Sequence, residues 1–266
     1  SKFELRKYGK GQLFICSRPC VPDAYSYNTQ YPHTPQANIH PHNWTHDTTL
    51  HRYTSTCKEY PLDVFAPHEV KFHSLDYRNV LHWKQHANST NDQQYFVQWK
   101  VYGEKQWTNA KECHGISRLL CDLSKETSDP REWYYARVHA AHSGTQSPWV
   151  LSARFNPKWE TSVSPPTMKL HVTEKGIVVR LKPPRSPHRR PNGSWISVRR
   201  LQRMSFTIHL MQSDVEEETF EMEGCAKQLL ISDLSPGTTY CLTAESRLHL
   251  LDRRSTRSPR ACITTL

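Results

Sequence analysis

Several features are absent from this 266-residue sequence, and each absence excludes a class of protein to which the chain could belong. No stretch comes near the 18 or so consecutive apolar residues of a membrane-spanning helix, and candidates such as "LFIC" at 13–16 are far too short. We therefore expect no membrane span. No basic stretch followed by an apolar one opens the chain, so a signal peptide has been removed or the sequence is a fragment.

Catalytic motifs are also absent. The chain contains no Gly-x-Ser-x-Gly, no Walker loop and no His-Glu-x-x-His, and its many His and Asp residues lie in no nucleophile context. The sequence therefore predicts no catalytic residues, no enzyme activity and no cofactor. An Arg-Gly-Asp triplet is missing as well, which disfavours an adhesion module of the matrix type.

The formal net charge of +10 raises the question of an anionic partner. Basic residues concentrate in one proline-rich region, 182–203, without a stacking motif or zinc-finger spacing beside them. A solvated loop on a basic secreted protein is therefore favoured over a nucleic-acid interface, and we expect no nucleic-acid partner. Weak binding to an acidic glycosaminoglycan lies between these two interpretations and stays open.

Cysteines and glycosylation sequons indicate an oxidising compartment. The sequence has eight cysteines and three Asn-x-Ser/Thr sequons, at Asn43, Asn88 and Asn192. Disulfides persist in secreted proteins and are rare in the cytosol. We therefore expect a secreted, extracellular protein that is glycosylated at these asparagines.

Residues 1–66 differ in composition from the rest of the chain. They are rich in His, Thr, Asn and Pro and show neither period 2 nor period 3.6. Such a segment can bury little apolar surface, so it is predicted to be disordered. Five histidines between His33 and His51, followed by Cys57, raise a zinc site as the alternative. Because their spacing fits no closed tetrahedral pattern, no metal site is predicted.

From Pro67 onward, short β-rich segments alternate with polar breaks, and the pattern repeats from Pro165. Corresponding segments of the two halves are offset by 97 and 105 residues, the size of one immunoglobulin-like sandwich. The sequence therefore predicts two sandwiches, 67–160 and 161–266, held at an elbow by a short linker. The segments expected to form strands are 69–74, 79–84, 95–102, 134–141, 167–172, 176–182, 204–211, 227–232 and 239–246.

The stretch "YFVQWKVYGEKQW" at 95–107 predicts a hairpin with Tyr102 and Gly103 at its tip. Glycine permits the turn, and the return strand is expected to begin near Gln106. Trp99 can fill the core, but Tyr102 at the apex has little core to join. A rigid exposed aromatic with a polar tip is the kind of residue that anchors interfaces, so Tyr102 is predicted to contact a partner.

Several motifs carry a family resemblance. "LSPGTTYCLTAES" at 234–246 has the Leu-x-Pro-x-Thr-x-Tyr spacing of fibronectin type III domains, and Trp83 sits where such domains bury a tryptophan. The segments "VKFHSLDYRNVLHWK", "YFVQWKVYGEKQW", "CDLSKETSD", "YYARV" and "SARFNPKWET", in this order, resemble class II cytokine receptors, the interferon and interleukin-10 receptor family. The resemblance covers 67–266 and implies an all-β fold of two tandem fibronectin type III domains.

The resemblance also implies a function. It indicates a soluble decoy receptor that binds interleukin-22, or a related helical cytokine of the interleukin-10 family, and blocks its signalling receptor. The alternative is the ligand-binding ectodomain of a membrane-bound receptor whose span is missing from this sequence. Because the Tyr-Gly hairpin of this family inserts against the cytokine, the expected contact residues lie in this hairpin and two further loops. They are Lys100, Tyr102, Gly103, Glu104, Thr127, Asp129, Leu250, Leu251 and Asp252. For the leucines, a packed loop is the rival interpretation.

Two disulfides follow from the family pattern, which pairs Cys113 with Cys121 and Cys241 with Cys262. Cys225 has no obvious partner in the family. Cys16 and Cys20 could bond to each other, which would leave Cys57 and Cys225. The pairing of these four cysteines stays open.

Overall fold

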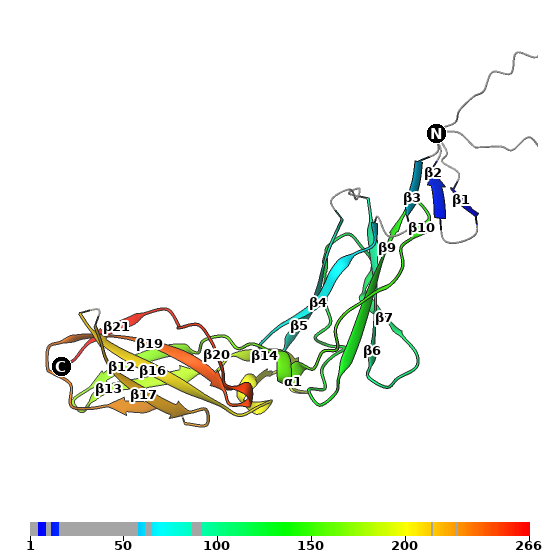
Figure 1. Cartoon of the computed structure of the whole chain (residues 1–266). Coiled ribbons are helices and arrows are strands. Elements are labelled where there is room, and N and C mark those ends of the chain that lie inside the picture. The colour runs from blue at the N-terminus through cyan, green and yellow to red at the C-terminus, as the bar shows by residue number, and fades with distance from the viewer. Residues whose placement is uncertain are drawn as a thin grey trace, which may run out of the picture. The chain divides into compact units, whose positions relative to one another are not determined.

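The structure is a computed structural model, and by its contacts the chain divides into two units, Ser1–Val64 and Phe65–Leu266 (Figure 1). Each unit is described by itself. The described residues are 5–8, 12–15, 58–61, 65–86, 92–213, 215–226 and 228–266.

The first unit contains one small antiparallel sheet of order β1-β2-β3. The sequence predicts no regular structure for residues 1–66, so this sheet departs from that expectation for the strands themselves. The histidines between His33 and His51 lie outside the described residues. The three strands are β1 (Leu5–Tyr8), β2 (Gln12–Ile15) and β3 (Lys58–Pro61).

The second unit begins with a sandwich of two antiparallel sheets, called the first sandwich. One sheet has the order β4-β5-β8, and the other has the order β10-β9-β6-β7 with β11 also paired to β9. Both sheets contribute the alternate residues of their strands to one core. The strands are β4 (His68–Leu75), β5 (Arg78–Lys84), β6 (Gln94–Val101), β7 (Thr108–Ile116), β8 (Leu120–Asp122), β9 (Tyr134–His142), β10 (Thr145–Gln146) and β11 (Val150–Leu151).

The core of the first sandwich follows the period of two that the sequence shows. Along β5 the side chains of Leu81 and Trp83 are buried, while the intervening positions are more exposed. The rings of Trp83 and Tyr95 lie 5.4 Å apart, which brings the two sheets into contact. The burial of Trp83 between sheets, implied by the fibronectin type III spacing, is confirmed.

A second sandwich follows in the same unit. Its sheets have the orders β12-β13-β18 and β17-β16-β19-β20, with β21 paired to β19, and a separate hairpin β14–β15 lies in the β13–β16 connection. Its elements are β12 (Thr167–Thr173), β13 (Gly176–Lys182), β14 (Arg185–Arg189), β15 (Trp195–Ser197), η2 (Val198–Arg200), β16 (Met204–Gln212), β17 (Val215–Glu223), β18 (Leu229–Ile231), β19 (Thr239–Leu248), η3 (Leu250–Asp252), β20 (Arg253–Arg254) and β21 (Ala261–Thr264).

A tyrosine hydroxyl closes one corner in each sandwich. In the second, Tyr240 accepts a hydrogen bond from the backbone N–H of Ser235 at 3.1 Å, as the Leu-x-Pro-x-Thr-x-Tyr spacing predicts. In the first, the hydroxyl of Tyr134 donates to the carbonyl of Asp129 at 3.0 Å. The expected all-β fold of two fibronectin type III sandwiches is therefore confirmed.

The connection between the sandwiches is bonded to both of them. It contains a short helix, α1 (Pro157–Glu160), which starts where the side chain of Asn156 accepts from the N–H of Trp159. Asp76 in the β4–β5 turn accepts from the N–H and hydroxyl of Ser164. The ring of Tyr77, in the same turn, joins the hydrophobic core of the second sandwich. Polar and apolar contacts together thus hold this connection.

Candidate partner-binding surface

The Tyr102 turn joins β6 to β7 and is closed by backbone hydrogen bonds. The N–H of Glu104 donates to the carbonyl of Val101 at 3.2 Å, and the N–H of Tyr102 donates to the carbonyl of Trp133 at 2.7 Å. Gly103 has φ +92°, and no atom lies within 4 Å of where its Cβ would be. Backbone conformation, not space, therefore requires glycine there. The return strand starts at Thr108, slightly later than expected.

The side chain of Tyr102 is 58% exposed, the greatest exposure of any large aromatic residue in the described part of the chain. The centre of its ring lies 5.4 Å from the guanidinium carbon of Arg154 and 6.2 Å from the centre of the Tyr135 ring. A partly oriented aromatic loses less conformational freedom on binding than a free one. The geometry therefore suits Tyr102 to anchor a partner.

Lys100 and Glu104 close the same turn from its two sides. The Nζ of Lys100 donates to the carbonyl of Glu104 at 3.0 Å, and the Oε2 of Glu104 accepts from the N–H of Val101 at 3.3 Å. Lys100 also lies over the ring of Trp107, at 4.9 Å. Both side chains thus help to shape the turn, and their contact with a partner stays a prediction.

The β8–β9 loop contains the second group of predicted contact residues, and here the expectation for Thr127 is wrong. Its side chain is completely buried, so it cannot meet a partner at the surface. The Oγ1 of Thr127 donates to the carbonyl of Leu123 at 2.7 Å and accepts from the Nδ2 of Asn79 at 2.8 Å. The hydroxyl satisfies buried polar groups beneath the loop, and Thr127 is therefore a supporting residue.

Asp129, in the same loop, remains at the surface but already has a partner. The guanidinium of Arg131 donates to both carboxylate oxygens, at 3.0 and 2.7 Å, and the backbone N–H of Arg131 donates at 2.9 Å. These hydrogen bonds lower the pKa of Asp129 to about 2. The carboxylate is therefore ionised at neutral pH, and a binding partner would meet an Asp–Arg pair.

The third loop follows β19 and only partly matches its prediction. Leu251 is 59% exposed and has φ +61°, whereas Leu250 is half-buried. Asp252 accepts from the guanidinium of Arg247, which lowers the pKa of this carboxyl. An exposed leucine held in the left-handed region costs free energy, so Leu251 is the member of this loop that a partner would best explain.

Two of the three loops lie next to each other, and the third reaches the connection. The hydrogen bond from Tyr102 to Trp133 joins the Tyr102 turn to the β8–β9 loop. Arg253, directly after the third loop, donates to the carbonyl of Thr161 in the connection at 3.0 Å. The side chain of Asn156 donates to the carbonyl of Glu132 at 2.7 Å, which ties the β8–β9 loop to the same connection.

A stack of aromatic and cationic side chains on the first sandwich is a feature that sequence reasoning missed. The guanidinium of Arg137 lies between the rings of Trp107 and Trp149, at 4.3 and 4.4 Å. Arg137 also donates twice to the Oε1 of Gln98, its partner on the neighbouring strand. No local sequence pattern predicts this stack, because its three side chains come from separate segments that only the folded sheet brings together.

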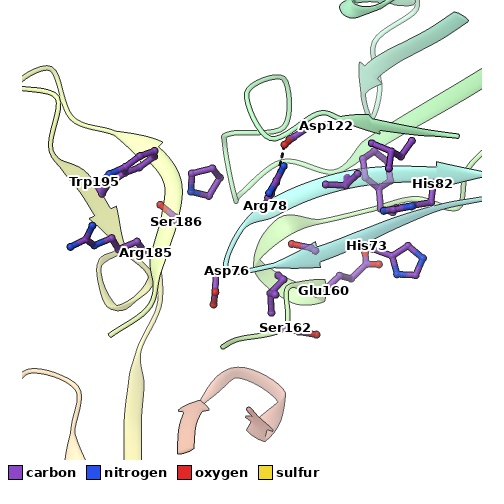
Figure 2. A pocket seen from close by; sticks show the side chains of 16 residues that line it. His73, Asp76, Arg78, His82, Asp122, Glu160, Ser162, Arg185, Ser186 and Trp195 are labelled. Carbon is purple, nitrogen blue, oxygen red and sulfur yellow. Dashed lines mark hydrogen bonds and ion pairs between the residues drawn. The ribbon is translucent and has the colours of Figure 1, made fainter. Parts of the chain in front are cut away.

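A shallow hollow of about 1200 Å³ separates the β4–β5 ribbon from the β14–β15 hairpin, and Figure 2 shows the side chains that line it. Arg78 and Asp122 form an ion pair across one wall at 3.0 Å. The rings of His73 and His82 lie 4.9 Å apart, and burial, followed by the neighbouring His73, lowers the pKa of His82. Within the described ranges, no three His, Cys, Asp or Glu side chains are placed to share a metal ion.

Both disulfides implied by the family pattern are present. Cys113 is bonded to Cys121 with an S–S distance of 2.00 Å, and Cys241 is bonded to Cys262 at 2.06 Å. Cys225 is free and exposed. Among the predicted glycosylation sites, only Asn192 falls in the described part, where it is exposed. The residues of such predictions that lie outside it are Cys16, Cys20, Cys57, Asn43 and Asn88.

Comparison with protein families matches each half of the chain. Residues 49–149 match the tissue factor family, and residues 161–266 match the fibronectin type III family of the interferon-alpha/beta receptor. The crystal structure of the chicken interferon gamma receptor alpha chain has the same fold, with a TM-score of 0.59 and 24% identity over 76% of this chain and 98% of that one. No helix in the described ranges is long and apolar enough to cross a membrane.

Individual proteins resemble this chain over most of its length and identify its family more narrowly than the family matches do. Interleukin-22 receptor subunit alpha-2 of Rattus norvegicus is 39% identical over 79% of this chain and 93% of its own length. The Homo sapiens protein of the same name is 32% identical over 76% of this chain and 89% of its own length. Interleukin-20 receptor subunit alpha of Mus musculus is 34% identical over 75% of this chain but only 37% of its own length. Fold, motifs and relatives agree, and the chain belongs to the class II cytokine receptor family.

Proposed function

We propose that this chain is a secreted decoy receptor that binds interleukin-22, or a related helical cytokine of the interleukin-10 family. Relatives that carry the name interleukin-22 receptor subunit alpha-2 support this proposal, because the chain matches them over 86% to 93% of their length. The interleukin-20 receptor relative is matched over 37%. The ectodomain of a membrane-bound receptor is the alternative to which this second relative points.

The exposed Tyr102 is the observation on which the proposed binding site depends. The turn is hydrogen-bonded at its base, and the ring stands at its tip with Arg154 and Tyr135 beside it. Interfaces concentrate their binding energy in a few central aromatic and arginine residues. We expect Tyr102 to be the central contact, with the Asp129–Arg131 pair and Leu251 as further contacts.

A decoy acts without chemistry, so we propose no catalytic residue and no enzyme activity for this chain. Its task is to occupy the face of the cytokine that the signalling receptor needs. Affinity differences between related complexes lie mostly in the dissociation rate. Slow dissociation is therefore the property expected to decide how well the chain neutralises its ligand.

The test is binding of interleukin-22 to the secreted chain and to its Tyr102→Ala and Tyr102→Phe variants, by surface plasmon resonance. Truncation of a central interfacial aromatic costs about 2 kcal/mol or more, so Tyr102→Ala should weaken binding roughly thirtyfold. Tyr102→Phe should retain the part of the affinity that depends on the ring. Leu230→Ala is the control, because Leu230 is a similarly exposed apolar residue, on β18 of the second sandwich.

Thermal melts of the same variants separate binding from folding. Tyr102 contributes little to the core, so the melting temperature of the Tyr102 variants should equal that of the unmodified chain. Unchanged affinity in Tyr102→Ala, or affinity lost only together with the melting temperature, would show that the tyrosine is structural. A panel of interleukin-10-family cytokines identifies the ligand, and failure to bind any of them refutes the proposed function. Sulfated glycosaminoglycan is a second partner that we propose, on a different surface.

A further inference from the structure

Nearly all of the net positive charge comes from one part of the second sandwich. Between Lys175 and Ser213 there are nine Lys and Arg residues and no Asp or Glu, whereas the other residues of the chain carry 26 basic and 25 acidic side chains. Six arginines of this stretch fall within 19 residues, in the connection from β13 to β16. We call them the basic surface: Arg185, Arg189, Arg190, Arg199, Arg200 and Arg203.

The guanidinium groups of the basic surface are exposed and almost free of carboxylate partners. Of these six arginines, in the ranges that the structure describes, only Arg203 lies within ion-pairing distance of a carboxylate, at 3.8 Å from Glu223. Arg199 donates to the carbonyl of Gly224 at 3.1 Å, which leaves its charge uncompensated. Uncompensated charges of one sign in a single connection repel each other, and a bound polyanion would relieve that repulsion.

The backbone beneath these arginines is held in place. Ser186 is buried and its hydroxyl donates to the carbonyl of Ile196 at 2.8 Å, which fastens β14 to β15. Val198, at the start of η2, is fully buried and its N–H donates to the carbonyl of Pro184 at 3.0 Å. A pre-ordered surface loses less conformational entropy when it binds than a flexible tail does.

Five of these six arginines line three shallow hollows, which acidic side chains line as well. Arg199, Arg200 and Arg203 line one hollow of about 520 Å³ at the base of the connection. On the hairpin, the guanidinium of Arg189 stacks on the ring of Trp195 at 3.7 Å, and that ring is 41% exposed. Figure 2 places Trp195 and Arg185 on the hairpin, opposite the β4–β5 ribbon across the larger hollow.

We propose that the basic surface binds a sulfated glycosaminoglycan. Arginine forms paired hydrogen bonds to planar or tetrahedral oxyanions better than lysine does, which suits it to sulfate groups. Exposed guanidinium groups spread along this connection fit a flexible polymer with repeated sulfates, and the exposed ring of Trp195 can pack on the apolar face of a sugar. A protein partner would need an apolar centre, and Trp195 is the one large exposed apolar side chain among the described residues 183–203.

The test uses the secreted full-length chain and heparin as the probe. The first variant is Arg199→Ala/Arg200→Ala/Arg203→Ala, and the second is Arg185→Ala/Arg189→Ala/Arg190→Ala. The control, Lys111→Ala/Lys158→Ala/Lys169→Ala, removes the same charge from exposed lysines outside the basic surface. Each arginine variant should bind immobilised heparin about tenfold more weakly in physiological salt and elute at lower salt, whereas the control should change little.

Two further arms test the chemistry. Replacement of the first three arginines by lysine keeps the charge, and affinity for heparin should still fall because the paired hydrogen bonds are lost. Desulfated heparin should not compete. The proposal would be overturned if the control Lys111→Ala/Lys158→Ala/Lys169→Ala lost as much heparin affinity as the arginine variants. It would also be overturned if the unmodified chain were not retained on heparin at physiological salt.

Measurement of cytokine binding keeps this proposal distinct from the proposed function. Tyr102→Ala should retain full heparin affinity, and the arginine variants should retain interleukin-22 affinity. If the arginine variants lose interleukin-22 but not heparin, the basic surface belongs to a protein interface and the glycosaminoglycan proposal is wrong. Asn192→Gln removes the sequon at the hairpin tip and should leave heparin affinity equal or higher, because a glycan there would lie beside Arg190.

Discussion

Each sandwich of this receptor has one disulfide, but the two bonds join different parts of the fold. Cys113 on β7 and Cys121 on β8 belong to opposite sheets, and both half-cystines are buried in the core of the first sandwich. Cys241 and Cys262 are directly paired neighbours on β19 and β21 of one sheet, and Cys262 is exposed. The same chemistry therefore staples two sheets together in one domain and reinforces a single strand pair in the other.

This contrast extends to how the sandwiches present their loops. In the first, the tyrosine corner ends on Asp129, one of the predicted contact residues. In the second, the corner ends on Ser235, away from the loop with Leu251. Core stability and the binding surface are thus coupled in the first sandwich more than in the second, and four predictions test that difference.

The largest difference is expected from removal of the disulfides. Through loop closure alone, the Cys241–Cys262 bond should stabilise the folded chain by about 3.3 kcal/mol and the Cys113–Cys121 bond by about 2.5 kcal/mol, because their sequence separations are 21 and 8. Cys113→Ala/Cys121→Ala also leaves space in a packed core, which adds about 1 to 2 kcal/mol. The first pair should therefore cost about 4 kcal/mol and Cys241→Ala/Cys262→Ala about 3, measured by urea unfolding. A greater loss from the second pair would show that loop closure dominates.

Removal of the stacked tryptophan in each sandwich should give the next largest effect. Trp107→Ala removes one of the two rings that contact Arg137 and the ring beneath Lys100, and we expect a loss of about 1.5 kcal/mol. Trp195→Ala frees only Arg189 on an exposed hairpin, so its expected cost is about 0.5 kcal/mol. Thermal melts of both variants check this order, and equal losses would contradict it.

The tyrosine corners should separate stability from binding. Tyr134→Phe and Tyr240→Phe each remove one hydrogen bond, so each should lower the free energy of unfolding by about 1 kcal/mol. Only Tyr134→Phe should also weaken cytokine binding, about threefold, because it releases the loop that holds Asp129. Calorimetry and surface plasmon resonance on the two variants make the comparison. A loss of binding in Tyr240→Phe would show that the two domains are coupled more strongly than proposed.

The smallest effect concerns the two exposed carboxylate–arginine pairs. The folded-state pKa of Asp129 is about 2, below the value of about 3.9 expected for an unfolded chain. Its pair with Arg131 therefore contributes stability that is fully present above about pH 4 and is lost as the pH falls through about 2. Solvent screening limits this contribution to a few tenths of a kcal/mol.

Carbon-13 NMR titration tests this pair directly. Arg131→Ala should return the pKa of Asp129 toward about 4. The control is Arg247→Ala, which should raise the lowered pKa of Asp252 and leave Asp129 unchanged. A normal pKa for Asp129 in the unmodified chain would show that the Arg131 contact does not persist in solution.

Much of the fold could be read from local patterns. Alternation in "VLHWK" and "MSFTIHLM" predicts strands that the structure contains as β5 and β16. Burial follows the period of two along β5, whereas residues 204–210 of β16 are buried on both faces. Tyr102 and Gly103 could be assigned to a turn from their own chemistry, since glycine supplies the positive φ that the turn needs. The Leu-x-Pro-x-Thr-x-Tyr spacing likewise gave the corner at Tyr240.

The candidate site was predicted less well where burial depends on distant residues. Thr127 has the same polar, turn-forming character as exposed residues, yet it is buried, and Asn79, which is 48 positions away, donates a hydrogen bond to its hydroxyl. Asp76 and Tyr77 lie in the β4–β5 turn, and only the fold brings them to Thr161 and Ser164 in the connection. No local period encodes such contacts.

The family resemblance implied the cysteine pairing. By itself the sequence determined nine of the strands, the Tyr102 turn and the concentration of arginines. These depend on spacing, residue type and backbone preference within a few positions. The tertiary structure alone decided that Thr127 is buried, that Arg137 lies between two tryptophans and that all but one of the arginines of the basic surface lack a carboxylate partner. The physical reason is that burial and charge compensation are set by neighbours in space, and in a sandwich those neighbours come from strands far apart in the chain.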